Sequence, residues 1–257
     1  MLPYLRSMEA FSLSLPNSWA DLSDHQLSFF FRQVARDLPM NEVLPICVCK
    51  WAYLVVFCRV DKHRFLIRQR YAKKEGIIFD WQLAVATRHL AFLESFPASP
   101  VRLTTVQGAE AVPADLQGVS FEDYLALENL YQGFLHTQSL ECLTDMTHLL
   151  YPALQAKASL PKEVLLSVFY WFASVKGAFA RLYPNFFSSV PDDDSNLLGS
   201  DPRIGEQLRQ AMNAQIRALT GGDITKEEQI LQMDCHRALT ELDAKAREAE
   251  EMRKQMG

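Results

Sequence analysis

The stretch YLVVFCRVDKHRFLIRQRY, residues 53 to 71, decides the fold class, because it places strands in a chain that is otherwise patterned for helices. Residues 53–60 are rich in β-branched and aromatic side chains, Asp61-Lys62 supplies a turn, and residues 64–71 repeat the pattern. Two such runs on either side of a short turn predict a β-hairpin. We expect Ile77 to Phe79 to add a short third strand.

Upstream of the hairpin, residues 11–15 alternate apolar side chains with serines, which predicts a short half-buried strand. Ser23 stands three residues before Gln26, the spacing of a capping box, and predicts a helix that Pro39 ends. Asn41 is expected to cap a second helix that runs through Trp51.

Downstream of the hairpin the pattern becomes helical. Asp80 is expected to cap a helix that reaches about Ser95, and Ser120 to cap another whose first turn carries acidic residues that suit the helix dipole. Further helices are expected over about 139–150, 161–182 and 203–219, and from a capping box at Thr225 to near the C-terminus.

These elements predict an α+β fold that is mostly helical, with a small antiparallel sheet in its N-terminal part and a long C-terminal helix. The stretch 107–118 is punctuated by proline and glycine, so we place a boundary there. The expected parts are residues 1–119 with the hairpin, 120–222 as a helical part, and 223–257 as the C-terminal amphipathic helix. One continuous domain is the alternative.

The composition is that of an ordinary globular protein, with 49% hydrophobic and 22% charged residues among 257. A net charge of -5 argues against a general nucleic-acid binder, which usually has a basic excess. The five cysteines are odd in number and irregularly spaced, which favours reduced thiols in a cytoplasmic protein. The apolar run from Val164 to Val175 is shorter than the roughly 20 residues of a membrane span, so we expect a buried core helix.

The sequence lacks the motifs of catalytic and nucleotide sites, such as a Gly-x-Ser-x-Gly elbow or a glycine-rich phosphate loop. Residues 192–196 begin like a calcium loop, but Leu197 and Arg203 stand where glycine and glutamate are needed. The Cys and His residues that lie nearest in sequence do not have zinc-site spacing, so we expect buried thiols; they are Cys47, Cys49, Cys58 and His63. We therefore expect no metal, no cofactor and no enzymatic activity, although a site assembled from distant residues stays an alternative.

The hairpin is basic, and its aromatic residues interleave with arginines and lysines between residues 59 and 74. Such a patch can contact phosphates, and it can equally be the solvated face of the hairpin or a surface for an acidic protein. If the protein is a nucleic-acid-binding accessory protein, we expect Arg64, Arg68 and Arg70 to make the contacts.

The C-terminal helix carries a heptad-like seam whose members are spaced four and three residues apart. They are Leu231, Cys235, Ala238, Leu242, Lys245, Ala249 and Met252. The seam either folds back on its own domain or docks on a partner helix or a second copy. The aromatic pair Phe186-Phe187 lies at the edge of a loop and is a second candidate contact. The expected partner-binding residues are Leu231, Cys235, Ala238, Leu242, Ala249, Phe186 and Phe187.

Several stretches resemble proteins that are encoded in prophages of gut bacteria and have no established activity. They are SWADLS at 18–23, NLYQG at 129–133, FYWFAS at 169–174, MNAQIRALT at 212–220, DITK at 223–226 and RALTEL at 237–242. The resemblance implies a phage context: a tail-assembly chaperone or a minor structural component of the particle, in the host cytosol or the virion. Its partners would be other assembly proteins or a second copy, and no catalytic residue is carried over.

Overall fold

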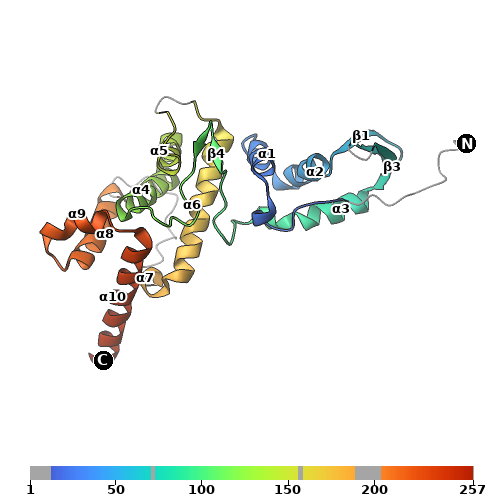
Figure 1. The fold of residues 1–257 in the computed structure, drawn as a ribbon. Helices are drawn as coiled ribbons and strands as arrows, with labels where there is room; N and C mark the ends of the chain where they lie inside the picture. The colour runs from blue at the N-terminus through green and yellow to red at the C-terminus, as the bar shows by residue number, and fades with distance from the viewer. Residues whose placement is uncertain (1–12, 71–72, 156–158, 189–203, 257) are drawn as a thin grey trace, which may run out of the picture. The chain divides into compact units, whose positions relative to one another are not determined.

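The computed structural model describes residues 13–70, 73–155, 159–188 and 204–256. Contacts divide the chain into two compact units, Met1–Pro97 (unit 1) and Ala98–Gly257 (unit 2). Helices make up 62% of the described residues, and a small antiparallel sheet lies in unit 1 (Figure 1). The predicted α+β class, with a long C-terminal helix, is confirmed.

Unit 1 places two helices before a three-stranded sheet and one helix after it. Its elements are the short 3-10 helix Trp19–Asp21, α1 (Asp24–Val34), α2 (Met40–Trp51), β1 (Leu54–Arg59), β2 (Arg64–Gln69), β3 (Lys74–Phe79), α3 (Asp80–His89) and the 3-10 helix Ala91–Glu94. The capping box at the start of α1 is confirmed, because the backbone N–H of Ser23 donates to the Gln26 side chain and that of Gln26 to the Ser23 hydroxyl.

The sheet is an antiparallel meander in the order β1-β2-β3, as the hairpin pattern predicted, and its third strand is longer than expected. A bulge interrupts β1 between Val56 and Cys58. One face of the sheet packs a small apolar core around Ile67, which is fully buried. The other face carries the arginines of β2, since side chains alternate along a strand.

Three local expectations for unit 1 are wrong. Residues 13–16 form no strand, and residues 11 and 12 lie outside the described part of the chain. Asn41 does not cap α2, because that helix begins one residue earlier, after Pro39. Asp80 lies inside α3 rather than before it, and the helix ends at His89, where a short 3-10 turn replaces the predicted continuation.

Unit 2 is helical apart from one two-residue strand pair. Its elements are β4 (Thr105–Val106), β5 (Ala109–Glu110), α4 (Phe121–Thr137), α5 (Leu140–Leu150), α6 (Lys162–Leu182), α7 (Pro184–Ser188), α8 (Ile204–Thr220), the 3-10 helix Ile224–Lys226, α9 (Glu227–Leu231) and α10 (Cys235–Met256). The Ser120 hydroxyl accepts the N–H of Asp123, so the predicted cap of α4 is confirmed.

The core of unit 2 forms around α6, beside which α5 packs (Figure 1). Tyr131 of α4 stacks on Phe169 of α6 with ring centroids 5.4 Å apart, and Trp171 and Phe172 are fully buried. By length and composition α6 is the one helix of the described chain that could cross a membrane, but half of its most apolar window is buried in unit 2. It is therefore a core helix, as expected.

The boundary between the parts lies earlier than the predicted one at residue 119. Residues 98–119 belong to unit 2, because their polar groups are bonded to its helices. The carbonyl of Ala114 accepts the indole N–H of Trp171 at 2.8 Å, and that of Leu103 accepts the Tyr151 hydroxyl at 2.9 Å.

The predicted continuous helix from Thr225 to the C-terminus is broken between α9 and α10. At the break, residues 233–235 run beside residues 119–121: Met233 O accepts the N–H of Phe121 at 2.7 Å, and Val119 O accepts that of Cys235 at 2.9 Å. This pairing joins segments that are far apart in sequence, so no local sequence pattern predicts it.

Candidate functional site

The apolar stripe of α10 is covered in its first half and open in its second. Cys235, Ala238 and Leu242 are buried at 0%, 0% and 4% exposure. Among residues 243–256 none is buried, and Met252 and Met256 are 57% and 84% exposed. Burial raises the pKa of the Cys235 thiol to about 12, which keeps it a neutral packing group.

Asp243 is the last residue of α10 that forms a hydrogen bond with another element among the described residues. Its carboxylate accepts the backbone N–H of Phe186 at 3.0 Å and the Asn185 side-chain amide at 2.8 Å, so it caps α7. Although partial burial opposes the charge, these hydrogen bonds hold the pKa of Asp243 below its usual range. Beyond this residue α10 projects from unit 2 (Figure 1).

The predicted partner-binding residues thus fall into two groups. Cys235, Ala238 and Leu242 are buried inside unit 2 and cannot contact a partner while the unit keeps this fold, so we remove them from the contact surface. Partly accessible are Leu231, Ala249, Phe186 and Phe187. The two phenylalanines pack edge to face with each other, with centroids 5.0 Å apart, which leaves neither fully exposed.

The arginines of the hairpin differ in how far they are neutralised. Arg64 forms an ion pair with Asp61 at 2.5 Å, and Arg68 lies 3.8 Å from the carboxylate of Glu75. Arg70, at the end of β2, is exposed and forms no ion pair with a residue of the described chain. The three predicted nucleic-acid contacts therefore do not form one uniform basic face.

The Cys and His residues of the N-terminal part are not brought together. Cys47 is buried, Cys58 is exposed on β1, and the His63 ring instead contacts the Asp80 carboxylate at 2.6 Å. No three His, Cys, Asp or Glu side chains within the described ranges lie close enough to hold a metal ion. The acidic loop at 192–196 lies outside the described residues.

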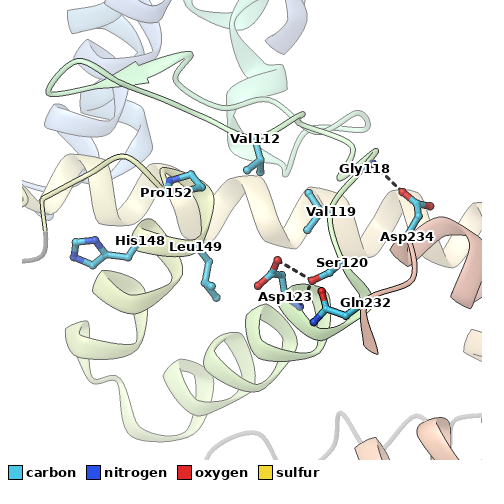
Figure 2. Close-up of a pocket in the computed structure, with 10 residues that line it drawn as sticks. All are labelled: Val112, Gly118, Val119, Ser120, Asp123, His148, Leu149, Pro152, Gln232 and Asp234. Carbon is cyan, nitrogen blue, oxygen red and sulfur yellow. Dashed lines mark hydrogen bonds between the residues drawn. The ribbon is translucent and has the colours of Figure 1, made fainter. Parts of the chain in front are cut away.

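Unit 2 contains a cavity of about 620 Å³ beside the break before α10 (Figure 2). It is the place where a site assembled from distant residues would form, because it gathers one histidine and two carboxylates. Figure 2 shows His148 on the α5 side and Asp234 on the opposite side, with Asp123 between them.

Both carboxylates of this cavity have structural partners. Asp123 accepts the Ser120 hydroxyl at 2.8 Å, and Asp234 accepts the backbone N–H groups of Gly118 at 2.8 Å and Arg237 at 3.1 Å. Burial opposes the Asp234 charge, but these backbone donors hold its pKa below the usual range. A general base works best with a pKa near the operating pH and within hydrogen-bond reach of a partner, and His148 forms no bond with either carboxylate in the described chain. The cavity therefore lacks a formed acid–base pair.

Sequence reasoning missed the structural role of two aspartates and the surroundings of Arg70. Asp234 and Asp243 act across long sequence separations, so only three-dimensional contacts reveal them. Arg70 lines a cavity of unit 1 together with Lys50 and His25, residues that no sequence motif links. The only sequence signal near that cavity was the capping box at Ser23, which fixes the start of α1 at one side of it.

Comparison with known proteins adds no relative to this picture. No protein-family model matches the chain, and no curated protein or solved structure matches it.

Proposed function

We propose that this chain is a non-enzymatic assembly protein of a phage particle, a tail-assembly chaperone or minor component, that works through protein–protein contacts of α10. The observation that carries the contact is the open second half of α10, which extends roughly 20 Å past its last buried residue, Leu242. The phage setting rests on the sequence resemblance alone, and with it the host cytosol or virion as the location.

A helix that projects without burial gains little stability from its own unit. Isolated helices shorter than about 12–15 residues are marginal in water, and tertiary packing usually supplies most of a helix's stability. Residues 244–256 contain one ion pair within the described chain, between Lys254 and Glu250, which is exposed and weak. A partner that covers this segment would supply the missing packing.

The contact face follows from helix geometry. At 100° per residue, four side chains fall within a narrow arc, and they continue the stripe that unit 2 buries. They are Lys245, Ala249, Met252 and Met256. Small and flexible apolar side chains flanked by charges suit a groove or a second helix, where methionine adapts its shape to the partner.

The test is affinity purification of the tagged chain from its native host during particle production, compared with a chain that lacks residues 244–257. We expect the complete chain to recover particle proteins in stoichiometric amount and the truncated chain to lose them. Light scattering on the purified chain then shows whether the partner is a second copy, because truncation would convert an oligomer to a monomer.

A matched pair of double variants isolates the face. Replacing Ala249 and Met252 with glutamine alters the stripe, whereas replacing Glu250 and Lys254 with glutamine alters the opposite side of the same turns. Only the first pair should weaken the recovery of partners. Equal recovery by the truncated and complete chains, or equal loss in both double variants, would reject the contact through α10.

A further inference from the structure

Unit 1 contains a cavity of about 760 Å³ between the start of α1, the end of α2 and the end of β2. Its volume lies within the range of small-molecule sites. His25, Lys50 and Arg70 line it, and no carboxylate does. In a chain with net charge -5, a cavity lined only by basic and neutral side chains is a local excess of positive charge.

The lining offers hydrogen-bond donors and few acceptors. The guanidinium of Arg70 has no ion pair among the described residues, unlike those of Arg64 and Arg68 in the preceding strand β2. Lys50 packs over the ring of Phe29 at 5.5 Å and contacts no described carboxylate. The carbonyl oxygen of Gln26 is occupied by Ser23, which leaves its amide as a donor. A ligand rich in acceptor oxygens matches this inventory.

Trp51 contributes its ring to the wall of the cavity. Its side chain is 5% exposed, and its indole N–H is buried with no hydrogen-bond partner in the described chain. Because this N–H has almost no accessible surface, it does not face the cavity, and the ring forms an apolar part of the wall.

Tyr53 gives the cavity an aromatic surface and fixes Arg70 beside it. Its backbone is in the left-handed region, with φ of 55°, at the position after the C-cap of α2, where this conformation commonly ends a helix. In this conformation its carbonyl accepts the backbone N–H of Arg70 at 3.0 Å. The Tyr53 side chain is 47% exposed, so a planar group can stack on it.

We propose that this cavity binds a nucleotide phosphate. The phosphate oxygens accept from Arg70 and Lys50, and the base lies against Tyr53. The phosphate belongs either to a free nucleotide or to a short single strand, which share this chemistry. The site is separate from α10 and does not depend on the proposed assembly function.

The test is calorimetric titration of the complete chain at low salt with adenosine monophosphate, inorganic phosphate, adenosine and a short single-stranded oligonucleotide. We expect the monophosphate to bind at least about tenfold more tightly than adenosine, since the charge-assisted bonds are lost without the phosphate. Arg70→Met should weaken its binding by about tenfold or more. Arg68→Met, two residues earlier in β2 and paired with Glu75, should leave the binding within about twofold.

Each outcome decides the proposal. Binding of the oligonucleotide alone, with the same dependence on Arg70, supports the phosphate site and assigns it to a strand. Absence of binding by every phosphate probe, or equal weakening by Arg68→Met and Arg70→Met, overturns it. Circular dichroism checks that each variant folds; should Arg70→Met fail this check, the exposed Lys50→Gln replaces it, with the same loss expected.

Discussion

Asp234 joins two distant segments of unit 2 through one carboxylate, since it accepts the backbone N–H of Gly118 and that of Arg237 in the first turn of α10. Removing it leaves two backbone donors without this acceptor and takes away the side-chain cap. At the scale of single residues, a substitution of Asp234 is therefore the one whose effect on stability the structure predicts most directly.

We expect Asp234→Ala to lower the free energy of unfolding by about 1 kcal/mol, the typical value of a helix cap. Urea unfolding followed by circular dichroism measures it. Asp145→Asn is the control, because Asp145 is an exposed residue of α5 without a hydrogen-bond or ion-pair partner among the described residues. A loss no larger than that of the control would show that the carboxylate does not hold the two segments.

The same carboxylate predicts a pH dependence. Its pKa is depressed in the folded state, so its contribution is present above the unfolded pKa of about 3.9 and is lost as the pH falls through the folded value. The stability difference between the natural chain and Asp234→Asn should therefore shrink as the pH is lowered from about 5. A difference that stays constant over acid unfolding curves would contradict this assignment.

The cysteines should differ sharply in reactivity. Burial raises the pKa of Cys47 to about 12, whereas Cys58 is exposed on β1. Because the thiolate is the nucleophile, iodoacetamide near neutral pH should modify Cys58 well before Cys47, and mass spectrometry of peptides locates the label. Equal labelling of both before unfolding would show that α2 is not packed as described.

At the scale of elements, the first half of α10 is packed in unit 2, whereas its second half is exposed. We expect Leu242→Ala to lower the free energy of unfolding by about 2–4 kcal/mol, because the side chain is 4% exposed. Met252→Ala, at 57% exposure on the same stripe, should stay within about 0.5 kcal/mol. Thermal unfolding of the two variants makes the comparison, and similar losses would mean that the second half of α10 is also packed.

The elements show where sequence pattern suffices. The capping box at Ser23, the cap at Ser120 and the hairpin are written in residues close together in the chain, and all were predictable. The alternation at residues 11–15 was not followed by a strand over its described part, because alternation alone supplies no pairing partner. The break before α10 was not predicted, because it depends on backbone hydrogen bonds between residues 233–235 and residues 119–121, which are distant in sequence.

The candidate sites divide in the same way. The seam of α10 was visible as a heptad spacing, but which half unit 2 covers depends on α7 and on Asp243, which no spacing reveals. The arginines of the hairpin were visible as a charge cluster. Arg68 is paired across the sheet by Glu75, which only the strand register reveals, whereas Arg64 is paired by Asp61 in the turn and Arg70 forms no ion pair among the described residues.

At the scale of the whole molecule, the boundary at Pro97 predicts which fragment folds. A fragment of residues 98–257 should unfold cooperatively with a helical spectrum, because it keeps the bonds from Leu103 and Ala114 to the helices. A fragment of residues 120–257 loses them and exposes the Trp171 indole, so its unfolding midpoint in urea should be clearly lower. Equal midpoints would return the boundary to residue 119.

The pairing of residues 119–121 with 233–235 also sets the order of events during synthesis. Domains generally fold as units, and the N-terminal one folds first as the chain leaves the ribosome. Unit 1 can complete its contacts while unit 2 is still being translated, whereas unit 2 cannot close until Met233 to Leu242 have emerged. Until then, the apolar faces of the helices of unit 2 that have already formed stay exposed. A ribosome that stalls before residue 233 would therefore release a folded unit 1 joined to an incompletely folded, aggregation-prone unit 2.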